Sequence, residues 1–155
     1  KNTSKKWVNN KNDGINKIGH ISGWNVSYVT NMNSMFNNAQ SFNEDISNWN
    51  VSNVTNMKSM FYRALSFDKP LNNWDVSNVT NMTEMFSFAI SFNQPLNSWN
   101  VSNIESMQRM FSSAYLFNQS LDAWDVNNVT VMERIFYGTS LNEAPNWYKK
   151  KVSIF

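Results

Sequence analysis

Apolar side chains recur along this chain at a fixed interval of 25 residues. The clearest markers are the tryptophans Trp24, Trp49, Trp74, Trp99 and Trp124. In each copy the tryptophan is followed in step by two aliphatic residues, a methionine, a phenylalanine and, in most copies, an alanine, a second phenylalanine and a leucine or isoleucine. A fixed period of this size is the signature of a repeat protein, and it falls in the range of leucine-rich repeats rather than helix-pair repeats.

One part of each copy predicts a short helix. In Val54–Ala64 the apolar residues occupy the first, fourth, seventh, eighth and eleventh positions, which fall within an arc of roughly 120° on a helix. Thr55 is placed as the N-cap of this helix. In the last copy Thr130 and Glu133 have the spacing of a capping box.

The other part predicts a short strand. In Leu71–Ser77, Trp74 and Val76 share one face and Asp75 points to the other. Parallel strands stack about 4.8 Å apart, whereas helices need about 8–10 Å between their axes. The strands would then line the concave face of a curved stack. The predicted fold class is therefore α/β, a leucine-rich-repeat-like solenoid of five to six 25-residue coils with short parallel strands on one face and short helices on the other.

The repeat also predicts the core and the ends of a single domain. Residues 1–20 are expected to form an N-terminal cap, 21–139 the repeat solenoid, and 140–155 a C-terminal cap with a basic tail. The five tryptophans are expected to form a structural core ladder, because they share a strand face with the inward valines. The alternative is an exposed aromatic ladder that stacks on sugars, and it would break the strand alternation.

Composition and charge narrow the function classes. With 15% charged and 41% hydrophobic residues the chain is expected to fold, and it has no apolar run long enough to span a bilayer. The absence of cysteine removes disulfides and thiolate metal sites. Residues 24–143 carry five basic and ten acidic residues, which argues against a nucleic-acid groove. No metal, no cofactor and no catalytic residue is expected.

The phrase Trp74–Phe86, continued by Phe92–Leu96, resembles the BspA-like repeat of bacterial surface proteins, which is abundant in mycoplasma lipoproteins and belongs to the leucine-rich-repeat group. The resemblance covers about residues 21–139. It implies an extracellular, cell-surface location, with the anchor or signal outside this sequence. It also implies adhesion or the binding of a host factor, and it supplies no binding residues.

A polar strip on the outward side of the predicted strands is the first candidate for a binding surface. Its members are Asn48, Asn50, Asn73, Asp75, Ser98, Asn100 and Asp125. The alternative is a hydrophilic coat that keeps the strands soluble. Asp75 and Asp125 lie two coils apart, roughly 10 Å, which is too far to share a calcium ion or to act as a retaining carboxylate pair.

A second candidate is an apolar contact patch where the copies differ: Tyr62, Leu65, Phe88, Ile90 and Tyr115. Exposed apolar residues on adjacent coils mark contact surfaces. The alternative is that they form the edge of the core. A further ladder of asparagines, Asn53, Asn78, Asn103 and Asn128, is predicted to be structural, and the single histidine, His20, is predicted to be a cap or surface residue.

The sequence thus predicts a non-enzymatic surface module that binds or adheres to a protein partner, such as a host or extracellular factor. Two alternatives stay open: a structural or antigenically variable spacer, which includes self-association, and a carbohydrate-binding domain with a glycan partner. Neither nucleic acid nor direct membrane insertion is expected.

Overall fold

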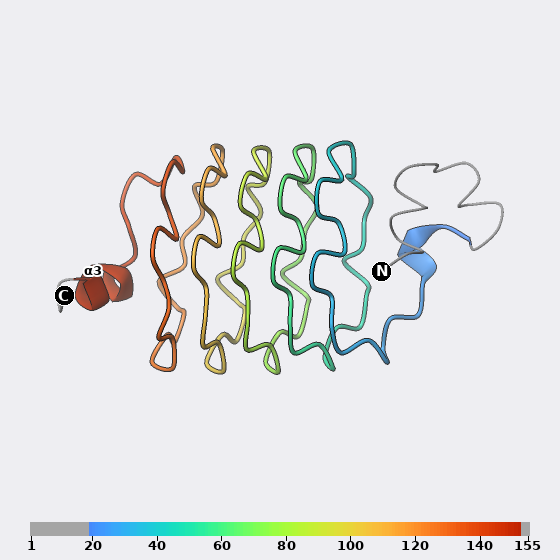
Figure 1. The fold of residues 1–155 in the computed structure, drawn as a ribbon, viewed down its shortest axis with the longest axis horizontal. Coiled ribbons are helices and arrows are strands. Elements are labelled where there is room, and N and C mark those ends of the chain that lie inside the picture. The colour runs from blue at the N-terminus through green and yellow to red at the C-terminus, as the bar shows by residue number, and fades with distance from the viewer. Residues whose placement is uncertain (1–18, 153–155) are drawn as a thin grey trace.

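The structure is a computed structural model that describes residues 19–152. The chain winds into coils of 25 residues that lie side by side along one axis (Figure 1). We number each coil from its tryptophan. Coils 1 to 5 comprise residues 24–48, 49–73, 74–98, 99–123 and 124–148.

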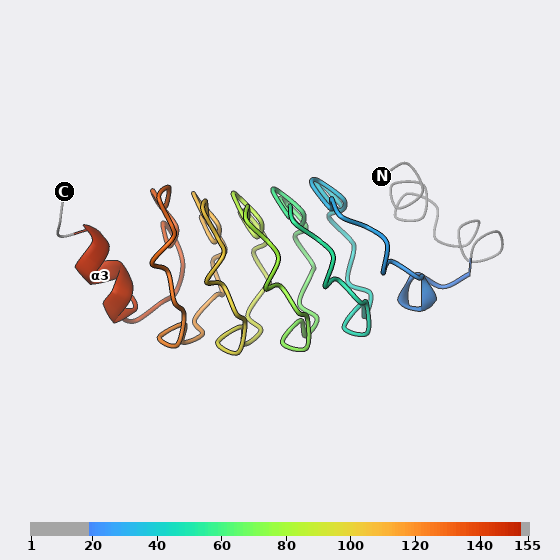
Figure 2. The same cartoon turned by 90° about the horizontal axis from the view of Figure 1, so that it is seen from below.

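Helices occur only at the two ends of residues 19–152. The 3₁₀ helix η1, Ile21–Gly23, precedes coil 1, and the α-helix α3, Asn146–Val152, closes the other end (Figure 2). Between them the only strand-like pairings are isolated parallel bridges that join one residue of each coil to the next. These residues are Asn31, Asn56, Asn81, Ser106 and Val131.

The predicted α/β leucine-rich-repeat-like solenoid is therefore wrong. Val54–Ala64 is not a helix and Leu71–Ser77 is not a strand, since both segments are built from successive turns. No sheet forms within the described residues. Coil-to-coil pairing also falls elsewhere than predicted, because the parallel bridge at Asn56 lies at the start of the predicted helix.

The backbone hydrogen bonds of coil 2 explain why no helix forms. The N–H groups of Met57, Ser59, Phe61 and Arg63 donate to carbonyl groups of coil 3, with N–O distances of 2.8–2.9 Å. Between them, the N–H groups of Met60 and Tyr62 donate to the carbonyls three residues back, and the N–H of Lys58 donates to the Asn56 side chain. Positive φ angles of 52° at Ser59 and 55° at Arg63 turn alternate groups outward. A helix would spend every interior N–H on its own carbonyls and leave none for the neighbouring coil.

The short distance between adjacent coils also favours turns over helices. The phenylalanine rings of adjacent coils lie 5.4–6.0 Å apart from Phe36 through Phe61, Phe86 and Phe111 to Phe136. Helices could not approach this closely, since their axes stay about 8–10 Å apart. Turns that share hydrogen bonds with their neighbours let adjacent coils approach to this distance, so the core rings of one coil stack on those of the next.

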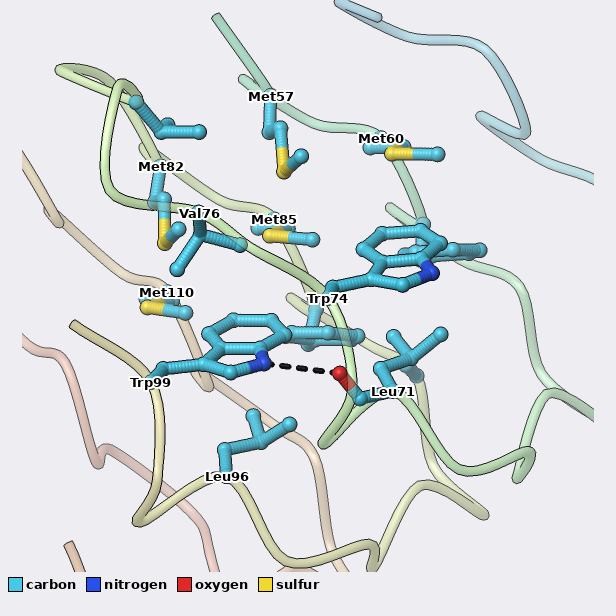
Figure 3. Packing of buried hydrophobic residues seen from close by; sticks show 14 of the residues in the cluster. Met57, Met60, Leu71, Trp74, Val76, Met82, Met85, Leu96, Trp99 and Met110 are labelled. Atoms are coloured by element: carbon cyan, nitrogen blue, oxygen red, sulfur yellow. Dashed lines mark hydrogen bonds between the residues drawn. The ribbon is translucent and has the colours of Figure 1, made fainter. Parts of the chain in front are cut away.

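Side chains, rather than a backbone ladder, link the coils where strands were predicted. The indole Nε1 of Trp99 donates to the carbonyl oxygen of Leu71 at 2.9 Å (Figure 3). Trp74 donates in the same way to Ile46 at 3.1 Å. The same bond recurs at Trp49, Trp124 and Trp147. Trp24 is the exception, because its buried Nε1 has no hydrogen-bond partner within residues 19–152.

The core consists of columns of equivalent side chains that run through all the coils. Figure 3 shows the indoles of Trp74 and Trp99 one above the other, beside a column of Met60, Met85 and Met110. The indoles from Trp49 to Trp124 are 3–4% exposed. Because the phenylalanine rings of one coil are covered by those of the next, no coil can bury its own apolar face alone.

The C-terminal end is capped by α3. Trp147 stacks on Trp124 with ring centres 6.3 Å apart, and Tyr148 meets Phe136 edge-on at 5.3 Å. At the other end His20 caps η1 by accepting a hydrogen bond from the backbone N–H of Ser22. Most of the predicted N-terminal cap, residues 1–18, lies outside the described residues.

The indole hydrogen bond can be tested by comparing Trp74, whose N–H is hydrogen-bonded, with Trp24, whose N–H has no partner within residues 19–152. We expect Trp74→Phe to lower the free energy of unfolding by about 2–4 kcal/mol, since it shrinks a buried side chain and leaves the Ile46 carbonyl without its donor. Trp24→Phe removes a donor that has no partner, so it should cost about 1 kcal/mol or less. Urea unfolding followed by circular dichroism measures both. Equal losses would show that the indole bond contributes nothing beyond packing.

Candidate interaction surfaces

The members of the predicted polar strip are all exposed, and several of them hold turns together. Asn50, Asp75 and Asn100 each accept hydrogen bonds from the N–H and the hydroxyl of the serine two residues on, at 3.1–3.2 Å and 2.6–2.7 Å. Asp125 accepts from the N–H of Asn127 in the same way. These contacts are Asx turns, in which the side chain substitutes for a backbone acceptor. The strip thus has a local structural role that its sequence pattern did not reveal.

The remaining members have weaker or no local partners. The hydroxyl of Ser98 donates to the Asn72 carbonyl at 3.2 Å, and the amide oxygen of Asn73 accepts from Asn72 at 3.3 Å. Asn48 is exposed on the same side of its coil. With its best acceptors used internally, the strip offers few groups that a partner could recognise.

The Asx turns also lower the pKa of the carboxylates that they contain. The Ser77 hydroxyl, followed by the Ser77 backbone N–H, lowers the pKa of Asp75 from its usual 3.8. The hydroxyl and N–H of Ser47 do the same for the pKa of Asp45, with a smaller contribution from Lys69. Both carboxylates are therefore ionised in neutral solution, and they act as fixed acceptors rather than as proton donors.

The asparagine ladder connects each Asx turn to the next coil. The Nδ2 groups of Asn53, Asn78, Asn103 and Asn128 donate to the carbonyls of Ser27, Ser52, Ser77 and Ser102 at 2.7–2.8 Å. These side chains are exposed at the surface, and their amides satisfy turn carbonyls of the preceding coil.

The predicted apolar patch lies at one turn of successive coils, and an arginine joins it. Tyr62 and Phe88 meet edge-on with ring centres 5.8 Å apart. The guanidinium of Arg63 lies 5.5 Å from the Tyr62 ring and 5.4 Å from the Phe88 ring. Leu65 and Ile90 are half-buried beside them. Phe88 holds a φ angle of 58°, which is uncommon for a bulky residue and fixes its ring at the coil edge.

The patch extends over coils 4 and 5 through residues that the sequence analysis did not select. Tyr115, Leu116 and Tyr137 are 55%, 58% and 66% exposed, and the Arg134 guanidinium lies 6.0 Å from the Tyr137 ring. Tyr137 occupies the coil position of Tyr62, which was the available signal in the sequence. We call this set the aromatic–arginine patch: Tyr62, Arg63, Leu65, Phe88, Ile90, Tyr115, Leu116, Arg134 and Tyr137.

Residues 19–152 contain neither a cluster of metal ligands nor a membrane-spanning helix. No group of three or more histidine, cysteine, aspartate or glutamate side chains there could hold a metal ion. None of the helices in that part of the chain is long and apolar enough to cross a membrane. His20, the single histidine, caps η1, and its Nε2 lies 3.2 Å from the carboxylate of Glu44.

The repeat matches the model of a known protein family. A family model described as "Mycoplasma protein of unknown function, DUF285" matches residues 9–87 and again residues 53–148. The chain belongs to this family. Its description names a bacterial genus, and the two overlapping matches reflect the repetition within the chain. No curated protein and no solved structure matches the chain.

The Asx turn predicts a specific pKa change. In Ser77→Ala the pKa of Asp75 should rise toward 3.8, because the hydroxyl is the largest cause of its lowering. A folded-state pKa below the unfolded one stabilises the protein above about pH 4, and this contribution is lost as pH falls through the folded value. Carboxyl NMR titration measures the pKa. Ser102→Ala, which removes the same hydroxyl from Asn100, should leave the Asp75 titration unchanged.

Proposed function

We propose that this chain is a bacterial cell-surface module that binds a protein partner, such as a host or extracellular factor, through the aromatic–arginine patch. The proposal places the chain among the BspA-like surface proteins, on the resemblance carried by Trp74–Phe86 and Phe92–Leu96. The leucine-rich-repeat fold is not part of it, since the coils contain neither the strands nor the helices of that fold. The extracellular location rests on the same resemblance, and no catalytic role is proposed.

The observation that carries the proposal is the composition and exposure of the patch. Tyrosine and arginine are the residues most enriched at the energetic centres of protein interfaces. Here the rings of Tyr115 and Tyr137 stand more than half exposed, and Arg134 lies within cation–π distance of Tyr137. Tyr62, Arg63 and Phe88 are already packed on one another. They would therefore lose little rotamer freedom on binding.

Burial of the tryptophans weighs against the glycan-binding alternative. An aromatic sugar platform needs exposed rings in a row, whereas the indoles of Trp49, Trp74, Trp99 and Trp124 lie in the core. The polar strip is a weaker candidate surface than the patch because its acceptors serve Asx turns. The patch is the better choice for a protein partner, whereas the spacer alternative predicts that it binds no host or extracellular factor.

The test uses an exposed tyrosine outside the patch as its control. We expect Tyr115→Ser combined with Tyr137→Ser to weaken binding to a partner about tenfold or more, because truncated interface tyrosines commonly cost about 2 kcal/mol. Tyr28, which is 87% exposed on coil 1, gives the matched variant Tyr28→Ser. Both variants should keep the melting temperature of the wild type, since the replaced side chains are exposed.

Binding would be measured by surface plasmon resonance against a panel of purified host-surface and extracellular-matrix proteins. Loss of binding in the double variant alone would support the patch. Equal binding by all three proteins would place the contact elsewhere. Failure of the wild type to bind any member of the panel would favour the spacer alternative, and light scattering across concentrations would then test self-association.

A further inference from the structure

A polar groove runs along coils 3, 4 and 5. Its residues lie nearer the start of each coil than those of the aromatic–arginine patch. It encloses about 580 Å³ and is lined by Asn78, Thr80, Asn103, Glu105, Asn128 and Thr130. These residues are two columns of equivalent positions, with asparagine in one column and threonine or glutamate in the other. No aromatic side chain lines the groove.

The donors in the groove are largely committed to the protein itself. Each asparagine Nδ2 donates to a serine carbonyl of the preceding coil at 2.7–2.8 Å. The hydroxyls of Thr80 and Thr130 donate to carbonyls of the preceding coil at 3.4 and 3.3 Å. Each amide keeps one further N–H, and both hydroxyl hydrogens are used.

The acceptors, in contrast, remain available. Within residues 19–152 no hydrogen bond reaches the Oδ1 atoms of Asn78, Asn103 or Asn128, and no ion pair reaches the carboxylate of Glu105. The hydroxyl oxygens also keep their lone pairs. The groove therefore presents a row of acceptors with one negative charge at its centre, and its complement is a cation rich in hydrogen-bond donors.

In the last coil, the ammonium of Lys151 binds a backbone carbonyl equivalent to those that accept from the asparagine ladder. In the inner coils the carbonyl of Ser102, for example, takes the Nδ2 of an asparagine in the next coil. The equivalent carbonyl of coil 5 is that of Asn127, and it accepts from the ammonium of Lys151 at 3.3 Å. The same ammonium also donates to the carbonyls of Val126 and Val129. A lysine thus takes the place of the ladder's amide donor directly beyond Asn128.

We propose that the groove binds the side-chain ammonium groups of a lysine-containing peptide segment of a partner protein. An ammonium carries three donors and no acceptor, which matches the unused acceptors of the groove, while the remaining amide N–H groups are left to solvent. Lysine fits better than arginine, because a guanidinium fork is best matched by paired carboxylate oxygens and only Glu105 supplies a pair. The site is separate from the patch, and its test does not depend on the proposed function.

The experiment titrates the isotope-labelled protein with trilysine and follows the side-chain amide NMR signals of Asn78, Asn103 and Asn128. We expect saturable shifts that weaken as salt is raised. Trilysine with acetylated side chains should produce none. Triarginine should bind more weakly than trilysine.

The variant Glu105→Gln should weaken trilysine binding about three- to fivefold, as expected for one exposed charge pair. Glu133→Gln removes the same charge from an exposed residue of coil 5 that does not line the groove, so it should bind as the wild type does. Equal affinities of the two variants, shifts with the acetylated peptide, or no saturable shifts with trilysine would each overturn the proposal.

Discussion

The structure depends on how the backbone divides its hydrogen bonds. Through Met57–Arg63 and its equivalents, alternate N–H groups turn outward to the next coil while the groups between them close turns within their own coil. Neither a helix nor an isolated set of turns could join neighbours in this way. The arrangement requires left-handed backbone at non-glycine positions such as Ser59 and Arg63. Strain of this kind persists only where the surroundings fix the conformation, and here the hydrogen bonds and the stacked rings of the next coil do so.

Packing and polar contacts follow from that division. Since each coil repeats the same turns, rings of the same type meet in columns, and Phe61 stacks on Phe36 and Phe86 at nearly equal distances. The same stacking brings the indole N–H groups from Trp49 onward, and each ladder amide, to a carbonyl of the preceding coil. Where the backbone supplies no ladder, these side chains supply the link. The two proposed binding surfaces use positions that this packing leaves exposed. The copies differ at Tyr115 and Tyr137, and the carboxylate of Glu105 has no ion pair within residues 19–152.

The periodicity of the sequence predicts the 25-residue unit. Hydrogen bonds between residues 25 or 26 positions apart agree with that period. The conformation within each unit does not follow from the same pattern. Apolar spacing in Val54–Ala64 suits a helical face, yet it suits equally a run of turns that returns a side chain to the core every three or four residues. The choice between helix and turns depends on the hydrogen bonds that the N–H groups of Ser59 and Arg63 donate to the next coil. These bonds require positive φ angles, which the sequence does not reveal because neither residue is glycine. Asp75 appeared as a surface acceptor, but the serine two residues later, Ser77, makes it part of a turn.

The bond between Trp99 and Leu71 has the same form as the bond between Trp124 and Leu96. Each boundary between coils is consequently interchangeable with the next. Excising residues 74–98 would set Trp99 against Ile46 as Trp74 is now, with the outward N–H groups of coil 2 facing the carbonyls of coil 4. Gene rearrangements that add or drop whole units would therefore alter the reach of the molecule without requiring any new contact to evolve.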